Sequence, residues 1–176
     1  MNISFIGLGK LGLPLASCLA GSGNKILGVD KNEYILDKLN NKELPFFEPK
    51  LTDIFPHENL VGFTDSYSKA VEETDASIIL VNTQLGDSGY SSEFVESALT
   101  DLSVNLRRSK KDYHLIIISS TVLPGSISKL IHLVEKISNR KYGKGFGFAY
   151  VPDFVRLGNV IYDFKNPEFF LIGANN

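Results

Sequence analysis

The first thirty residues constrain the fold more than any other stretch of the chain. An apolar run at residues 3–6 stops at a glycine, and three glycines then follow in G-x-G-x-x-G spacing. These are Gly7, Gly9 and Gly12. Apolar residues at helical spacing occupy 13–20, and a second apolar run at 26–29 ends on Asp30. The pattern predicts a strand, a tight turn, a helix and a second strand that closes on an acid.

Each part of this unit suits the binding of a dinucleotide. Gly7 permits the turn, Gly9 lets a pyrophosphate approach the backbone, and Gly12 allows the helix to pack closely on the strand. The helix N-terminus offers unpaired N–H groups and the positive end of the helix dipole to phosphates. Asp30 can accept hydrogen bonds from a ribose diol and would repel a 2′-phosphate. The unit therefore predicts NAD, rather than NADP, as the cofactor.

Composition narrows the class of protein. The 176 residues suit one α/β domain with a substantial core, and a formal net charge of −2 gives no electrostatic case for nucleic acid or a membrane surface. No apolar run reaches the length of a spanning helix, and Met1 leads straight into a strand, so we expect a cytoplasmic protein without a signal peptide. Cys18 lies in the first predicted helix, where we expect a buried thiol.

Strands and helices alternate along the rest of the chain. The expected strands lie at 60–63, 76–81, 114–118, 146–150 and 169–172. The expected helices lie at 31–41, 66–73, 92–106 and 126–138, with one helical turn near 50–54. Residues 82–91 are expected to form a loop. This order predicts a single α/β domain over 1–176, a Rossmann-type doubly wound, mainly parallel sheet with helices on both faces.

Ligands of such sheets bind beyond the carboxyl ends of the strands. Three polar elements directly follow predicted strands, so we expect them to meet there. They are Gly7–Gly12, Asn82–Thr83 and Ser119–Thr121. Thr83 and Thr121 have an alternative role, because threonine at a strand end often caps its own turn.

The motifs, taken together, resemble the amino-terminal, NAD-binding domain of the UDP-glucose/GDP-mannose dehydrogenase family over essentially the whole chain. Matching segments occur in the family's order, although Gln84 replaces a proline of the V-x-T-P turn. They are GLGKLGLPLA at 7–16, FEPKL at 47–51, VNT at 81–83, STVLPGS at 120–126, PDFVRLG at 152–158 and DFKNP at 163–167.

The resemblance implies an enzyme that oxidises the C6 hydroxyl of a UDP- or GDP-sugar to a carboxylate, with two NAD per turnover. Its implied cofactor-binding residues are Gly7, Gly9, Lys10, Leu11, Gly12, Asp30, Thr83 and Thr121. Thr121 and Asp153 are the implied catalytic residues, and Asp153, Phe154 and Arg156 the implied substrate-binding residues. The family also implies a homodimer for the full-length protein, and neither nucleic acid nor a membrane as a partner.

Two departures and one absence qualify the implied activity. Asp153 stands where the family usually has glutamate, and Leu157 stands where many members have a second glutamate. The family's catalytic cysteine and most of its sugar-nucleotide pocket lie in segments beyond the first domain. We therefore expect this chain, as a fragment, to bind NAD without turnover. The alternatives are a stand-alone NAD-sensing or partner-binding module, and a different NAD-dependent dehydrogenase of the 6-phosphogluconate or 3-hydroxyacid type.

Several residues have plainer structural interpretations. Asp153 is also suited to a helix N-cap, Arg156 to a helix surface and Glu48 to a turn or cap. The pairs Phe46–Phe47 and Phe169–Phe170 are expected in the core, with Phe46–Phe47 as a possible cover for the adenine. The three histidines lack acidic or cysteine partners at metal-ligand spacing, so no metal site is expected.

Overall fold

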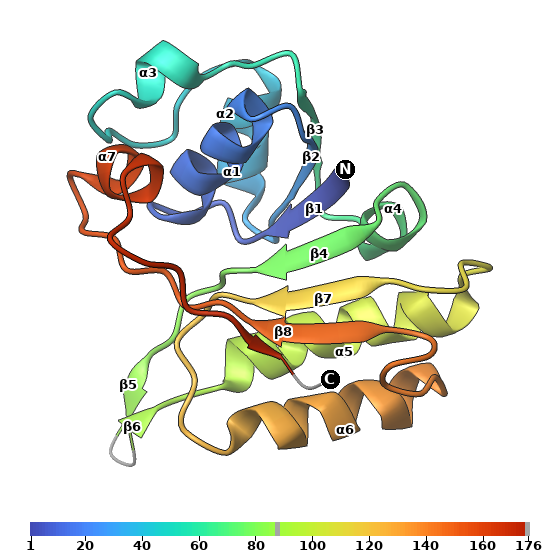
Figure 1. Cartoon of the computed structure of the whole chain (residues 1–176). Helices are drawn as coiled ribbons and strands as arrows, with labels where there is room; N and C mark the ends of the chain where they lie inside the picture. Colours follow the sequence, from blue (N-terminus) through green and yellow to red (C-terminus); the bar gives the residue numbers. More distant parts are fainter. Residues whose placement is uncertain (87–88, 175–176) are drawn as a thin grey trace.

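A seven-stranded sheet forms the centre of the molecule in the computed structural model, which describes residues 1–86 and 89–174 (Figure 1). The strands follow the order β3-β2-β1-β4-β7-β8-β9 across the sheet. Their bounds are Asn2–Ile6 for β1, Lys25–Val29 for β2, Leu60–Thr64 for β3, Ala76–Ile79 for β4, Leu115–Ile118 for β7, Gly147–Tyr150 for β8 and Gly173–Ala174 for β9.

Strand direction and order identify the topology. Every neighbouring pair from β3 to β8 is parallel, and only the edge strand β9 runs antiparallel to β8. The strand order reverses beside β1, where β2 and β3 lie on one side and β4, β7 and β8 on the other. This is the doubly wound order of a Rossmann-type sheet, so the predicted fold class is confirmed.

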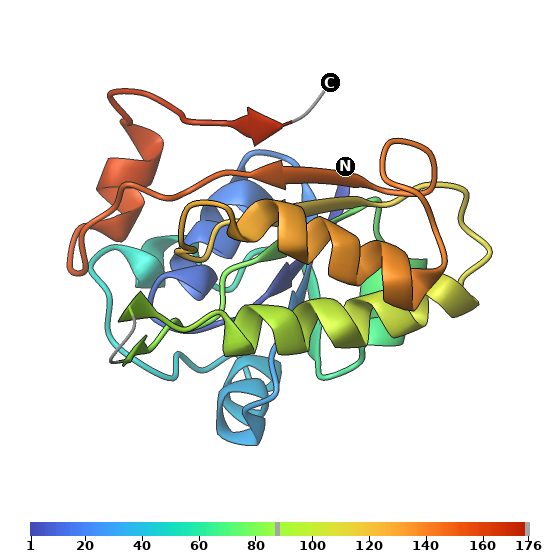
Figure 2. The ribbon, with the colours of Figure 1, turned by 90° about the horizontal axis from the view of Figure 1, so that it is seen from below.

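Helices cover both faces of the sheet (Figure 2). Tyr67–Glu72 (α4), Glu93–Arg108 (α5) and Ser126–Ser138 (α6) pack on one face in the largest apolar cluster. The other face is covered by Gly12–Gly21 (α1), Glu33–Asn40 (α2), Leu51–Ile54 (α3) and Val160–Lys165 (α7). Because both faces are covered, β1 and β2 are buried almost along their whole lengths, as expected of parallel strands.

The structure differs from the prediction in two segments, residues 82–91 and residues 169–172. The expected loop 82–91 contains a short antiparallel ribbon of β5 (Leu85–Gly86) and β6 (Gly89–Tyr90), while residues 87–88 of that prediction lie outside the described residues. The strand expected at 169–172 is wrong, because the pairing with β8 begins only at Gly173. Phe169 and Phe170 were expected in the core, but they are 56% and 63% exposed.

The helix α7 was not among the expected helices, and it depends on a residue more than a hundred positions away. The buried carboxylate of Glu48 accepts hydrogen bonds from the backbone N–H groups of Gly158 and Val160, at 3.1 and 3.0 Å. These groups lie at the first turn of α7, so Glu48 caps this helix. The predicted cap role of Glu48 is confirmed. Its neighbour Phe47 is 84% exposed, so that ring does not belong to the core.

Candidate functional site

A cleft of about 780 Å³ opens at the carboxyl ends of the central strands, the ends marked by the arrowheads in Figure 1. It brings together the three polar elements that the sequence placed after strands, and most of the predicted site residues line it. These are Gly7, Gly9, Lys10, Leu11, Gly12, Asp30, Thr83, Thr121 and Asp153. A volume of this size lies in the range of cofactor sites.

The glycine turn is specified by the closeness of the backbone around it. Gly7 has φ +99°, and a Cβ on it would stand 2.2 Å from the carbonyl oxygen of Leu80. A Cβ on Gly12 would stand only 1.8 Å from the carbonyl oxygen of Gly7, so α1 must meet the turn at a residue without a side chain. Gly9 differs, because a Cβ there would meet no protein atom within 4 Å. Its bare backbone therefore leaves room on the cleft side for a ligand.

Asp30 follows β2 directly, and two backbone N–H groups hold its carboxylate. Its Oδ2 accepts a hydrogen bond from the N–H of Leu8 at 2.7 Å, and its Oδ1 accepts one from the N–H of Asn32 at 2.9 Å. Each carboxylate oxygen retains a lone pair for a further donor. The geometry thus joins the glycine turn to an oriented acceptor, as a ribose diol beside a pyrophosphate would require.

The ends of β4 and β7 are tied together by Ser120. Its hydroxyl accepts a hydrogen bond from the N–H of Val81 at 2.9 Å and donates to the carbonyl oxygen of Val81 at 3.0 Å. Thr83 and Thr121, which follow these strand ends, both line the cleft. Within the described part of the chain, neither threonine hydroxyl has a hydrogen-bond partner, so the alternative that they cap their own turns is not supported.

Asp153 lines the far end of the cleft in an irregular stretch between β8 and α7. The interpretation as a helix N-cap is therefore wrong, because the next helix begins only at Val160. Burial raises the pKa of Asp153 to about 6, against the opposing effect of a hydrogen bond from Ser119. A carboxyl group with this pKa exchanges its proton close to neutral pH, which suits proton transfer.

Phe154 and Arg156 lie outside the cleft lining. Phe154 packs against Phe169, with ring centroids 5.0 Å apart. The Arg156 guanidinium forms two hydrogen bonds with the Asp163 carboxylate, at 3.0 and 2.7 Å. Arg156 is in the irregular stretch, so its expected place on a helix surface is also wrong. The substrate role of both residues stays a prediction, and neither faces the site in this structure.

Three side chains that line the cleft were not predicted from the sequence. Lys31 follows β2, and Tyr67 and Ser97 lie on α4 and α5. Only the position of Lys31 directly after Asp30 was a signal in the sequence. Leu157, a departure from the family's pattern in the sequence, also lines the cleft. Phe46 and Phe47 are absent from the lining, so the proposed adenine cover is not supported.

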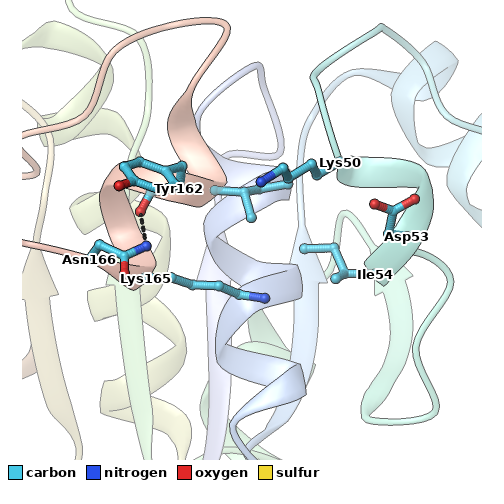
Figure 3. A pocket seen from close by; sticks show the side chains of 7 residues that line it. Lys50, Asp53, Ile54, Tyr162, Lys165 and Asn166 are labelled. Carbon is cyan, nitrogen blue, oxygen red and sulfur yellow. Dashed lines mark hydrogen bonds between the residues drawn. The ribbon is translucent and has the colours of Figure 1, made fainter.

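A second, smaller hollow of about 180 Å³ lies between α3 and α7 (Figure 3). Lys50 and Asp53 line one side and Tyr162, Lys165 and Asn166 the other, and the Lys50 ammonium lies 5.8 Å from the Tyr162 ring centroid. This hollow shares no residue with the cleft. A hollow of this volume is too small to hold a dinucleotide.

In 1–86 and 89–174, no three His, Cys, Asp or Glu side chains gather closely enough to hold a metal ion. Within the same ranges, no helix has the length and apolar character needed to cross a membrane.

The Rossmann-type sheet, the glycine turn and the oriented acid at the end of β2 define a dinucleotide-binding domain. Comparison with known proteins specifies the family. Residues 1–176 match the family model described as the UDP-glucose/GDP-mannose dehydrogenase family, NAD binding domain. The chain belongs to this family, and NAD is its cofactor. The match also argues against the alternative of a 6-phosphogluconate or 3-hydroxyacid dehydrogenase.

Individual relatives agree with the family match. A GDP-mannose 6-dehydrogenase of Pseudomonas syringae pv. syringae is 35% identical over 179 residues, and a UDP-glucose 6-dehydrogenase of Rickettsia bellii is 34% identical over 183 residues. These alignments span 98% and 100% of this chain but 40% and 39% of the relatives. A crystal structure of a ternary complex of GDP-mannose dehydrogenase from Pseudomonas aeruginosa superposes with a TM-score of 0.94 at 31% identity, and covers 100% of this chain and 41% of that one.

Proposed function

We propose that this chain is the cofactor domain of a nucleotide-sugar 6-dehydrogenase, an NAD-dependent oxidoreductase that converts the C6 hydroxyl of a UDP- or GDP-sugar to a carboxylate. The observation that supports this most directly is the cleft, in which the glycine turn and Asp30 share one lining with Thr83, Thr121 and Asp153. Oxidation of a primary alcohol to an acid requires two hydride transfers and one water. Bound NAD supplies the hydride acceptor.

The residues of the chain divide into two groups within this proposal. The turn at Gly7–Gly12 and the N-terminus of α1 bind the pyrophosphate, while Asp30 accepts hydrogen bonds from the adenosine ribose. Thr121 and Asp153 lie toward the other end of the cleft, beyond β7 and β8. Asp153 holds or releases a proton there, because its raised pKa of about 6 allows both states near neutral pH.

The chain spans about 40% of the length of the relatives that it matches. Its single cysteine, Cys18, is buried in α1, and burial raises the pKa of that thiol, so Cys18 does not suit nucleophilic chemistry. We therefore assign the catalytic thiol and most of the sugar pocket to a segment outside these 176 residues. We also propose a cytoplasmic homodimer for the complete protein, with neither nucleic acid nor a membrane as partner.

The first test is cofactor binding by the complete protein that contains this chain. Calorimetry should show NAD binding more tightly than NADP, since the Asp30 carboxylate repels a 2′-phosphate. Asp30→Ala should weaken NAD binding about tenfold, which corresponds to ~1.4 kcal/mol. The matched control is Asp37→Ala, an exposed acid on α2 that does not line the cleft. An unchanged affinity of the Asp30 variant would show that the ribose lies elsewhere.

The second test is production of NADH with UDP-glucose, UDP-hexosamines and GDP-mannose. One of these sugars should give two NADH per sugar oxidised. Leu157 favours a second candidate function, a module that binds NAD without catalysis. This apolar side chain lines the cleft where many family members have a glutamate. Tight NAD binding without NADH from any sugar would therefore support a stand-alone NAD-sensing or partner-binding module instead.

A further inference from the structure

A lysine lies directly beside Asp30, the acid proposed to bind the ribose, and its ammonium group already pairs with another carboxylate. Lys31 follows Asp30 at the end of β2 and lines the same cleft. Its Nζ lies 2.7 Å from Oδ2 of Asp101 and donates a hydrogen bond to Oγ of Ser97 at 3.2 Å. The same ammonium lies 5.8 Å from the centroid of the Tyr67 ring. Three groups from α4 and α5 thus lie around the ammonium of this cleft-lining lysine.

A cation in this position matters for the choice between NAD and NADP. The two cofactors differ by a phosphate on the 2′-hydroxyl of the adenosine ribose, and a basic side chain close to the ribose-binding acid is what accommodates that phosphate. A lysine next to Asp30 is such a side chain. Asp30 alone would therefore not ensure selectivity if Lys31 were available to a 2′-phosphate.

We propose that Asp101 is a specificity-determining residue of the cofactor site, which pairs with Lys31 and so withholds this cation from the 2′-phosphate of NADP. The inference rests on the proposed placement of the ribose at Asp30. Asp101 does not line the cleft, so it acts through Lys31 and is a positioning residue. Ser97 and Tyr67 support the same placement of the ammonium.

The surroundings of Tyr67 show that these charges share one neighbourhood. Burial raises the pKa of this phenol, and the carboxylates of Asp101 and Asp30 raise it further. Tyr67 therefore lies within electrostatic reach of both acids, with Lys31 among them. The side chains of Lys31 and Asp101 are 59% and 42% exposed, so water weakens their attraction. The ion pair therefore changes the affinity for NADP only by the small amount typical of an exposed pair.

The experiment compares dissociation constants of NADP and NAD by calorimetry at low ionic strength, in the complete protein. Asp101→Asn keeps the size of the side chain and removes its charge. We expect the ratio of the NADP constant to the NAD constant to fall about two- to fivefold, the range that corresponds to an exposed ion pair. The double variant Lys31→Met with Asp101→Asn should return the ratio to its original value or above it.

A matched control separates this effect from a general loss of negative charge. Glu33 is an exposed acid two positions from Lys31, and it forms no ion pair with the residues that the structure describes. Glu33→Gln should leave the ratio unchanged. A ratio that is unchanged in Asp101→Asn, or that stays low when Lys31 is also replaced, would overturn the role of Asp101. Failure of the unaltered protein to bind NAD would instead overturn the proposed function, and the inference with it.

Discussion

At the scale of single residues, the three motif glycines have different physical reasons to be glycine. Gly7 and Gly12 have backbone atoms where a Cβ would stand, whereas Gly9 has open space. The first two are therefore required by the fold. Gly9 is required only if a ligand approaches its backbone, and we propose the pyrophosphate of NAD as that ligand.

This difference gives a prediction that separates folding from binding. Gly9→Ala should leave the melting temperature nearly unchanged and weaken NAD binding about tenfold, or ~1.4 kcal/mol, because the methyl group occupies only the ligand side. Gly12→Ala should lower the free energy of unfolding by about 1–3 kcal/mol or prevent folding, since its methyl overlaps the Gly7 carbonyl. Thermal melts and calorimetry measure the two quantities.

Gly21→Ala is the matched control for both variants. Gly21 ends α1, and a Cβ on it would meet no atom within 4 Å. The substitution should stabilise the protein by up to about 1 kcal/mol through helix propensity and leave NAD binding unchanged. A loss of stability in Gly9→Ala equal to that in Gly12→Ala would contradict the ligand role of Gly9.

At the scale of elements, α7 depends on Glu48 although the two are distant in sequence. The Val160 N–H is buried, so it loses its acceptor entirely when the carboxylate is removed, whereas the exposed Gly158 can turn to water. Glu48→Ala should therefore lower the free energy of unfolding by about 1–3 kcal/mol. Amide hydrogen exchange at Val160 should accelerate more than exchange in β1.

Glu43→Ala serves as the control for this element. Glu43 pairs with Lys38 at the surface, with 57% of its side chain exposed, and its removal should cost less than about 1 kcal/mol. An equal loss of stability in the two variants would show that Glu48 acts as an ordinary surface acid rather than as a cap.

At the scale of the whole molecule, a buried histidine at the amino end of the sheet links stability to pH. His114 Nε2 forms a hydrogen bond with the Ser77 hydroxyl at 2.8 Å, and Ser77 bonds Ser4 of β1 at 2.6 Å. Burial, with help from Lys111, lowers the pKa of His114 from 6.5 to about 4. The folded state therefore holds His114 neutral over a range in which the unfolded chain takes up a proton.

The sign of the pH effect follows from this lowered pKa. The contribution of His114 to stability is complete above pH 6.5 and is lost as the pH falls through about 4, by about 3 kcal/mol. Asp153 has the opposite sign, because its raised pKa favours folding below 3.8 and that contribution is lost as the pH rises through about 6. Denaturant unfolding of His114→Gln should isolate the histidine, since Asp153 is common to both proteins. If the free energy of unfolding changed with pH in the same way in the variant and the unaltered protein, His114 would not be the source of this pH dependence.

The class of fold, and the dinucleotide-binding character expected of the first βαβ unit, could both be predicted from the amino-acid sequence alone. Apolar periodicity, three glycines and Asp30 act within thirty residues, where chain geometry leaves few alternatives. The motifs at 81–83 and 120–126 likewise predicted the edge of the sheet at which Thr83 and Thr121 lie. These features are local, so each can be recognised before any long-range contact is known.

Long-range packing selects which distant residues lie at the site and which lie away from it. It paired Lys31 with Asp101, capped α7 with Glu48, and turned Arg156 toward Asp163 and away from the cleft. It also left Phe47, Phe169 and Phe170 exposed, although their apolar character predicted burial. Such contacts join positions separated by several elements. They depend on how helices pack on the two faces of the sheet, and periodicity along the chain does not encode that packing.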